Sequence, residues 1–254
     1  MMTPENKPVD SETINVLKNR QSIRKYASAP VSDAHVDAIL SGALRAPTSS
    51  NLQAYSVIVV RDADTKAQLA VPCGNQQHIV DCPVFIAFCA DLTRIESALQ
   101  RNGHDIENNN LELGLVASID ASLVGMAAYV SAESLGIHGV MIGAMRNKPE
   151  DIAEILGLPQ RVYAVFGMCL GYPAQEPKQK PRMPVTGTVH YQRYDAAASL
   201  AVIDPYDAEL KRHYDSIGKE SDPHSWTHEV DKKFSPRPRN GLRAALKERG
   251  FDFM

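Results

Sequence analysis

Residues 111–135 read LELGLVASIDASLVGMAAYVSAESL and form the one long apolar run of the chain. A membrane span of about 20 residues rarely tolerates several polar side chains. The polar residues here include Glu112, Asp120, Ser122, Ser131 and Glu133. The apolar residues recur at helical spacing until Gly136, a typical helix stop. We therefore predict a central core helix, with a broad buried face made of Leu115, Ile119, Leu123, Met126, Ala127 and Val130.

Shorter segments on both sides of this run predict a mixture of helices and strands. A helix begins at Ser32-Asp33 and stops at Pro47, and another begins near Asn147 and ends at Gly157. Runs rich in β-branched and aromatic residues predict strands over 55–60, 84–89 and 162–166. Two further helices are expected near 208–216 and 242–249. The pattern indicates an α+β fold in a single domain, 1–254, with residues about 185–254 as a C-terminal extension.

Composition excludes several classes of function. The 254 residues carry a net charge of −3, whereas binding to nucleic acid or to an anionic membrane requires clustered Lys and Arg. We therefore expect no nucleic-acid partner and no membrane association. The four cysteines show no Cys-x-x-Cys spacing, which predicts buried free thiols in a reducing compartment. The polar N-terminus is unlike a secretion signal, so we expect a cytoplasmic protein.

Arg20-Gln21-Ser22-Ile23-Arg24 places two guanidinium groups and a hydroxyl within five residues. Arginine donates in a planar fork that matches phosphate oxygens, and it stays charged at any working pH. The serine hydroxyl can turn to suit a ligand. Such a run can also be a solvated surface turn, so a functional interpretation needs partners from elsewhere in the chain.

Three other segments could supply those partners. Residues 46–53, APTSSNLQ, crowd hydroxyls and amides between a predicted helix and a predicted strand. Residues 139–146, GVMIGAMR, contain small residues that let the backbone approach a flat ring. Lys180-Pro181-Arg182 adds two cations on a stiffened backbone.

These four segments, in this order, resemble the nitroreductase superfamily, in particular its large oxygen-insensitive NAD(P)H nitroreductases and flavin reductases, which bind FMN. Residues 166–173, FGMCLGYP, add to the resemblance, which covers most of the chain. The resemblance implies a mixed central sheet flanked by helices and an intertwined homodimer. It also implies one non-covalently bound FMN in each of two pockets at the dimer interface.

The resemblance also implies the residues that hold FMN. Arg20 and Ser22 would hold the phosphate and ribitol end, and Arg24 would reach the N1 and O2 edge of the flavin. Lys180 and Arg182 would complete the phosphate cage. The other residues in contact with the cofactor would be Gln21, Ile23, Thr48, Ser49, Ser50, Asn51, Gln76, Met141, Ile142, Gly143 and Ala144. Residues 48–51 would line the ring edge partly from the partner subunit, and the backbone of 141–144 would pass close to N5 and O4.

The chemistry implied by this resemblance belongs to the flavin and not to a catalytic side chain. NADPH or NADH would give a hydride to N5, and a nitroaromatic or quinone would then take two electrons in a ping-pong cycle. Two alternatives remain open. The protein could be a flavin reductase that releases reduced FMN to a partner, or a binding module that holds FMN without turnover.

The chain departs from the family pattern at some positions. Residues 213–222, HYDSIGKESD, stand where members that prefer NADPH usually carry an arginine-rich patch. Lys219 could act there as a point charge, but Glu220 and Asp222 oppose that role. Ala144 replaces a common second glycine, and Met141 replaces a common tyrosine.

Other chemistries receive less support from the sequence. His224 and His228 share one helical face, but two ligands are too few for a metal site. Cys169 has no neighbour in sequence that would activate it as a nucleophile. His138 and His190 could be structural residues or substrate contacts, and Trp226 could pack in the extension or edge the substrate channel.

Overall fold

A computed structural model describes residues 9–107, 111–219, 225–236 and 239–253. The chain divides into two compact units. The first contains the residues up to Pro177 and those from Gly241 onward, and the second contains Lys178–Asn240. The single-domain organisation with an extension from about residue 185 stays a prediction.

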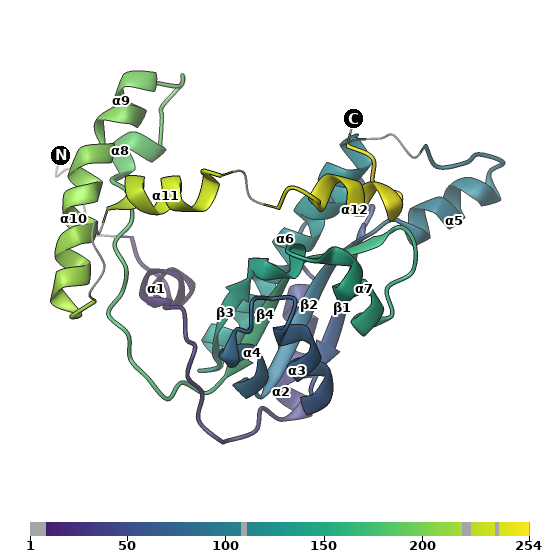
Figure 1. Cartoon of the computed structure of the whole chain (residues 1–254), viewed down its shortest axis with the longest axis horizontal. Coiled ribbons are helices and arrows are strands. Elements are labelled where there is room, and N and C mark those ends of the chain that lie inside the picture. Colours follow the sequence, from purple (N-terminus) through teal and green to yellow (C-terminus); the bar gives the residue numbers. More distant parts are fainter. Residues whose placement is uncertain (1–8, 108–110, 220–224, 237–238, 254) are drawn as a thin grey trace, which may run out of the picture. The chain divides into compact units, whose positions relative to one another are not determined.

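A four-stranded sheet forms the centre of the first unit (Figure 1). Its strands are β1 (Tyr55–Val60), β2 (Val84–Asp91), β3 (His138–Ile142) and β4 (Val162–Gly171), in the order β1-β2-β4-β3. All three pairings are antiparallel. The predictions of β1, β2 and β4 are confirmed, whereas β3 falls in a segment without a clear strand pattern in its sequence. The α+β class is confirmed.

Helices of the first unit begin and end at recognisable sequence signals. The Ser32 hydroxyl caps α2 by accepting a hydrogen bond from the His35 N–H. Helix α7 has Pro149 at its start and ends at Gly157, whose φ of 62° is left-handed. The helices of this unit are α1 (Glu12–Asn19), α2 (Asp33–Ala43), η1 (Ser49–Asn51), α3 (Ala63–Ala70), α4 (Gln77–Asp81), α5 (Thr93–Arg101), α6 (Leu111–Ser134), η2 (Gly143–Arg146), α7 (Pro149–Leu156) and α12 (Leu242–Glu248).

The sheet separates two hydrophobic cores, because successive side chains of β2 point to opposite faces. Ile86 and Phe88 pack with α2 and α6 on one face. Phe85 and Ala87 pack with α3, α4 and α7 on the other face. Strand β2 is therefore buried on both sides along its whole length. The four cysteines are free and buried, as the sequence predicted.

Helix α6 is a core helix, as predicted, but its buried face was assigned wrongly. Its buried side is made mainly of small residues. Among them is Gly125, where an added Cβ would lie 2.3 Å from the Phe166 ring. Small residues let the helix axis approach the sheet closely, so the larger side chains turn outward. Those side chains are Leu115 (45% exposed), Ile119 (54%), Leu123 (38%) and Met126 (41%).

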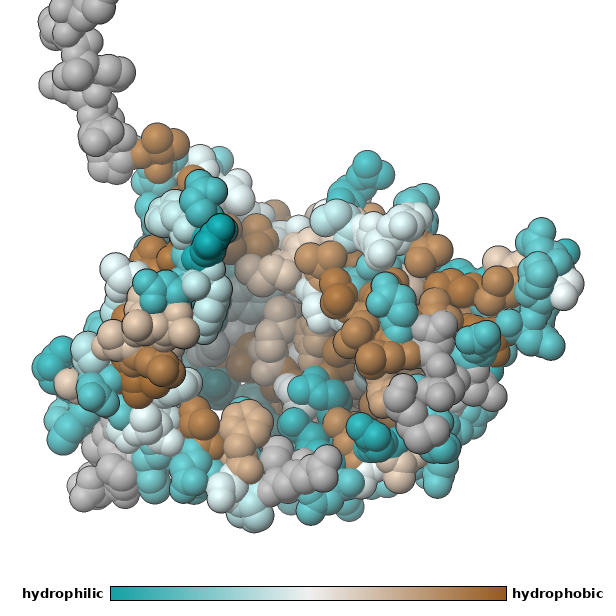
Figure 2. Space-filling view, turned by 90° about the horizontal axis from the view of Figure 1, so that it is seen from above, coloured by the Kyte–Doolittle hydropathy of each residue, from teal (hydrophilic) through white to brown (hydrophobic). Residues whose placement is uncertain are grey.

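We call Leu115, Ile119, Leu123 and Met126 the outer stripe. Figure 2 shows hydrophobic side chains at the surface of one face of the protein. The exposed large apolar side chains of the protein include those of the outer stripe. Among the described residues, α6 is the one helix long and apolar enough to cross a bilayer by length and composition. Its opposite side packs against α2 and the sheet.

The second unit is helical in its described part. Its helices are α8 (Val185–Thr188), α9 (Ala196–Ala201), α10 (Ile203–Ser216) and α11 (Trp226–Phe234). Tyr206, Leu210 and Tyr214 lie four residues apart and form the buried face of α10. The helices predicted near 208–216 and 242–249 are thus confirmed as α10 and α12.

Candidate flavin site

The Arg20–Arg24 segment follows α1 and lies against the start of β3. The Ile23 N–H donates to the Gly139 carbonyl at 3.0 Å, and the Ile23 side chain is buried. Arg20 is half-buried, and its guanidinium donates to the Ser22 hydroxyl at 3.1 Å and to the Tyr129 hydroxyl at 3.3 Å. The structure therefore brings together two of the segments that the sequence singled out.

Arg24 is exposed, on the side of the segment near α4. Burial lowers the pKa of His78 in α4, and the nearby charge of Arg24 lowers it further. The Nε2 atom of His78 is buried without a hydrogen-bond partner. Gln76 precedes α4, and its side-chain amide donates to the Cys73 carbonyl at 2.7 Å. Arg24, Gln76 and His78 thus belong to one region of the first unit.

The loop over residues 48–53 is fixed by a carboxylate that the sequence analysis did not identify as a site residue. Asp120 of α6 is fully buried, and it accepts the Ser49 N–H at 2.9 Å and the Ala54 N–H at 3.1 Å. Between these contacts, Ser50, Asn51 and Gln53 adopt left-handed backbone angles, with φ of 45°, 57° and 51°. Non-glycine residues rarely adopt such angles without support from the surrounding structure.

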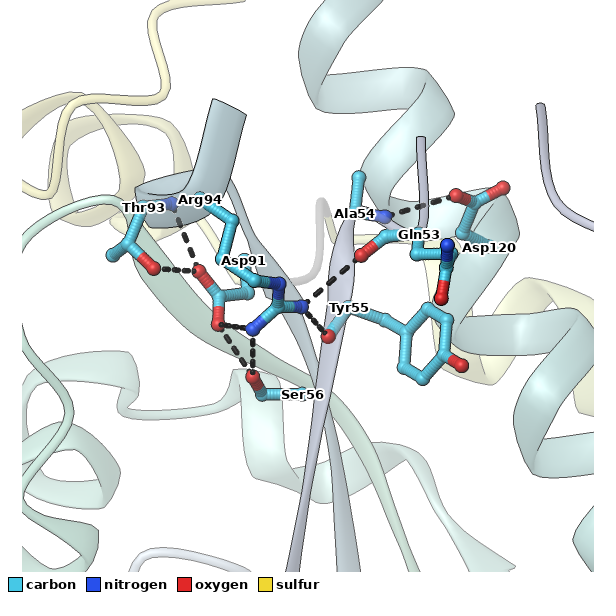
Figure 3. A network of polar contacts seen from close by, with 8 residues as sticks. All are labelled: Gln53, Ala54, Tyr55, Ser56, Asp91, Thr93, Arg94 and Asp120. Carbon is cyan, nitrogen blue, oxygen red and sulfur yellow. Dashed lines mark hydrogen bonds and ion pairs between the residues drawn. The ribbon is translucent and has the colours of Figure 1, made fainter. Parts of the chain in front are cut away.

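A second polar network holds the end of this loop from the side of β1 (Figure 3). The Arg94 guanidinium donates to the Gln53 carbonyl at 3.0 Å and also to the Tyr55 carbonyl. It forms an ion pair with Asp91 at 3.3 Å. Asp91 in turn accepts hydrogen bonds from Ser56 and Thr93, which lower its pKa against the effect of burial. The loop is therefore held at both ends by charged groups.

Strand β3 is an edge strand, and its residues continue into η2. Gly139 must be glycine, because an added Cβ would lie 2.1 Å from the Cys169 carbonyl oxygen. Ile142 is buried, whereas the Met141 side chain is 37% exposed. An Arg146 hydrogen bond to the Val165 carbonyl ties the end of η2 back to β4. Among residues 139–144, Met141 is therefore the exposed side chain, and Gly143 and Ala144 are partly exposed.

Lys180 and Arg182 belong to the second unit. The Lys180 ammonium lies 5.0 Å from the centre of the Tyr214 ring, and Lys219 lies 4.0 Å from the same ring. Arg182 is exposed and donates to the carbonyls of Lys180 and Pro181. Glu220 and Asp222, whose negative charges oppose a role of Lys219 as a point charge, lie outside the described residues.

His138 and His190, which the sequence left as structural residues or substrate contacts, both have local partners. His138 forms an ion pair with Glu133 at 2.7 Å, and the hydrogen bond from this pair raises the pKa of His138. His190 accepts the Asp195 N–H at 3.3 Å and contacts the Tyr194 ring. His224 lies outside the described residues. Within the described ranges, no group of three His, Cys, Asp or Glu could hold a metal ion.

Helix α6 organises the two segments of the first unit that carry the most donors. Asp120 and Tyr129 are nine residues apart on this helix, which at about 1.5 Å and 100° per residue separates them by roughly 13 Å on opposite sides of the axis. Asp120 holds the 48–53 loop, and Tyr129 holds the Arg20–Arg24 segment. A carboxylate in the middle of an apolar helix is costly to bury, so Asp120 could have been singled out from sequence on that ground.

The donor set suits an anionic, flat cofactor. Two guanidinium groups and a hydroxyl on residues 20–24 match phosphate oxygens and an electron-rich ring edge. The β3 edge and the 48–53 loop offer backbone N–H groups, hydroxyls and amides. Fold and donor groups together indicate an α+β protein whose residues 20–24 suit a phosphate-bearing aromatic ligand.

Comparison with known proteins agrees with this class. The model of the nitroreductase family matches residues 17–172, and the model of its C-terminal domain matches residues 180–254. The chain belongs to the nitroreductase family.

Its relatives match over nearly their whole length. The chain is 32% identical to an NADPH-flavin oxidoreductase of Vibrio harveyi, over 94% of this chain and 98% of the relative. It is also 32% identical to an oxygen-insensitive NADPH nitroreductase of Salmonella typhimurium, over 95% and 98%. Among solved structures, NfrA2 of B. megaterium superimposes with a TM-score of 0.91 at 34% identity, over 96% of this chain and 100% of that chain.

Proposed function

We propose that this protein is an FMN-dependent oxidoreductase that takes a hydride from NADPH or NADH and passes two electrons to nitroaromatic or quinone acceptors. Family membership and relatives named as NADPH-flavin oxidoreductase, FMN reductase and nitroreductase support this activity. The observation that supports it is the contact between the Arg20–Arg24 segment and β3, in which the Ile23 N–H donates to the Gly139 carbonyl. When bound, FMN supplies the hydride-accepting N5 atom.

In this proposal, different residues of the 20–24 segment bind different parts of the cofactor. Arg20 and Ser22, already hydrogen-bonded to each other, bind the phosphate and ribitol end. Gln21 and Ile23 contribute backbone in the same stretch. Arg24 is exposed and reaches the N1 and O2 edge, where a fixed cation stabilises the negative charge of the reduced ring.

The remaining segments keep in this proposal the roles that the family resemblance implies. Lys180 and Arg182 would supply positive charge for the phosphate. The amide of Gln76 faces the ring or the ribitol, and the backbone of residues 141–144 borders the N5 and O4 edge. Residues 48–51 line another ring edge in the geometry that Asp120 imposes on them.

We propose further that the protein is a homodimer and that residues 48–51 of one subunit serve the pocket of the other. The outer stripe supports dimerisation, because it leaves four large apolar side chains of α6 at the surface. Asp120 and Tyr129 project on opposite sides of α6, so the segments they hold are separated within one chain. A second copy packed on the stripe would bring together segments from different subunits.

The reaction itself we propose to be ping-pong, with donor and acceptor using the same open face in turn. Besides the second subunit, its partners in this proposal are small acceptors and a nucleotide, without nucleic acid or membrane. We place the protein in the cytoplasm, in agreement with its four buried free thiols.

The experiment is an anaerobic titration of the purified protein. The visible flavin band is recorded without added FMN and then followed during additions of NADPH and, separately, NADH. Bleaching by either nucleotide, reversed by a nitroaromatic or a quinone, is the expected result. Failure of both nucleotides to bleach a bound flavin would favour a binding module. Absence of flavin binding even after reconstitution would contradict the proposal.

One further measurement distinguishes the proposed function from the flavin reductase alternative, which the relatives named FMN reductase favour. Ultrafiltration under anaerobic conditions after reduction measures how much flavin leaves the protein. Reduced flavin that stays on the protein and reacts there with nitroaromatics supports the proposed function. Release of most of the reduced flavin into the filtrate would contradict the proposed function and support a flavin reductase that supplies reduced FMN to a partner.

A further inference from the structure

Tyr129 lies where α6, β3 and the Arg20–Arg24 segment meet. Its side chain is 3% exposed, and its hydroxyl donates to the Gln21 carbonyl at 2.9 Å. The hydroxyl also accepts a hydrogen bond from the Arg20 Nε at 3.3 Å and lies 3.4 Å from the Gly139 carbonyl. Gly139 is the residue whose carbonyl receives the Ile23 N–H. One phenol group therefore contacts both flanks of the candidate site.

The ring of Tyr129 has a second role beside that of its hydroxyl. The Arg20 guanidinium carbon lies 5.2 Å from the ring centre, a cation–π distance. Arg20 is thus held by the ring face, by the hydroxyl and by Ser22. An arginine side chain has several rotatable bonds, and contacts that fix it before a ligand arrives reduce the entropy cost of binding.

Glu133 supports this arrangement from the next turn of α6. Its side chain is 5% exposed, and its Oε2 atom lies 2.7 Å from the His138 Nδ1, whereas its Oε1 atom is buried without a partner. Burial raises the pKa of Tyr129 to about 12, and the neighbouring Glu133 also raises it. The phenol therefore keeps its proton and remains a donor to the Gln21 carbonyl.

Packing alone does not explain a tyrosine at this position. The neighbouring buried residues of α6 are small, among them Ala128 and Ala132, and a phenylalanine would fill the same volume. A buried hydroxyl is costly to desolvate unless it is hydrogen-bonded. Here the two shorter hydrogen bonds of the hydroxyl go to residues 20 and 21, which start the segment proposed to hold the phosphate, and the longest goes to the Gly139 carbonyl.

We propose that Tyr129, supported by the Glu133–His138 pair, is a positioning residue that sets Arg20 and the backbone of residues 21–23 for the phosphate end of FMN. This inference rests on the proposed function and deepens it. It requires no contact between Tyr129 and the cofactor, because the effect passes through Arg20 and the Gln21 carbonyl.

The test compares FMN with riboflavin, which lacks the phosphate. Dissociation constants of both ligands are measured on the apoprotein by quenching of flavin fluorescence, for the wild type and for Tyr129→Phe. The substitution keeps the ring that stacks on Arg20 and removes the hydroxyl. We expect the preference for FMN over riboflavin to fall at least tenfold. A purely structural role would weaken both ligands together and leave the preference unchanged.

Tyr163 offers a matched control. It is 5% exposed and belongs to the same unit, and its hydroxyl is hydrogen-bonded to the Ser118 hydroxyl at 2.5 Å and not to the candidate site. Tyr163→Phe removes an equally buried hydroxyl, and we expect it to leave the ligand preference within twofold of the wild type. Glu133→Gln weakens the support without touching residues 20–23, and we expect a smaller fall in the same direction as for Tyr129→Phe.

The outcomes distinguish the positioning role of Tyr129 from the proposed function on which it rests. An unchanged preference in both Tyr129→Phe and Glu133→Gln, or an equal fall in Tyr163→Phe, would overturn the positioning role. Failure of the wild-type apoprotein to bind either flavin would overturn the proposed function itself.

Discussion

The two faces of α6 differ in chemistry, and each performs a different task. The inner face carries small residues and is flanked at its two edges by Asp120 and Tyr129, which are buried and bonded to segments far away in the sequence. The outer stripe carries large apolar side chains and no such bonds. An apolar helix can therefore be buried through its small residues and leave its large ones at the surface.

Loss of the Asp120 carboxylate should lower the free energy of unfolding more than any other change on the inner face. Asp120→Ala leaves the N–H groups of Ser49 and Ala54 buried without their acceptor. Each hydrogen bond to a charged group contributes about 1.5–3 kcal/mol, so we expect the free energy of unfolding to fall by about 3 kcal/mol or more. Urea denaturation measures this change. A loss below about 1 kcal/mol would show that Asp120 does not fix the loop.

A charge placed on the outer stripe tests the other face. Ile119→Asp should raise the dimer dissociation constant at least 100-fold, because a carboxylate would be buried without a partner when two copies associate. Sedimentation equilibrium measures the association. Asp37→Ala, at an exposed position on α2, serves as the surface control. An unchanged dimer in Ile119→Asp would remove the stripe from the interface.

The Arg94 network should contribute less to stability than Asp120, because Arg94 is itself exposed. Arg94→Ala removes donors to the Gln53 and Tyr55 carbonyls. We expect the free energy of unfolding to fall by about 1–2 kcal/mol. We also expect faster amide hydrogen exchange in residues 49–53. Exchange at the wild-type rate would show that Asp120 alone holds the loop.

The smallest effect is expected at His138, which borders the inner face through Glu133. The pKa of His138 is raised above its ordinary value by this pair, so its stabilising contribution is complete below about pH 6.5 and is lost as the pH rises through the folded-state pKa. The stability difference between wild type and His138→Asn should therefore be larger at pH 6 than at pH 9. At pH 6 this stability difference should be about 0.5–1 kcal/mol for a partly exposed pair. An equal difference at both pH values would contradict the charged pair.

Sequence patterns predicted those elements whose signals are local. The runs at β1, β2 and β4 were rich in β-branched and aromatic residues, and the caps of α2 and α7 marked those helices. Strand β3 was not recognised, because it is short and contains Gly139. The face of α6 was predicted wrongly, because hydrophobicity alone does not say which apolar surface faces the sheet and which remains at the surface.

The candidate site was predicted in its segments but not in the residues that hold them. Arg20 to Arg24 and residues 48–51 carry polar patterns visible in the sequence. Asp120 and Tyr129 act on partners 66 to 109 positions away. No local pattern reveals contacts of that range, since they form only when the chain has folded around α6.

The decisive measurement is the amount of FMN bound per chain by alanine variants of Arg20, Arg24 and Arg182. Wild type, Arg20→Ala, Arg182→Ala and Arg24→Ala are purified alike, and the flavin content is measured after gel filtration. The account predicts depleted flavin in Arg20→Ala and Arg182→Ala. In Arg24→Ala it predicts nearly full flavin that NAD(P)H reduces slowly or incompletely. Full occupancy with normal reduction in all three variants would contradict it.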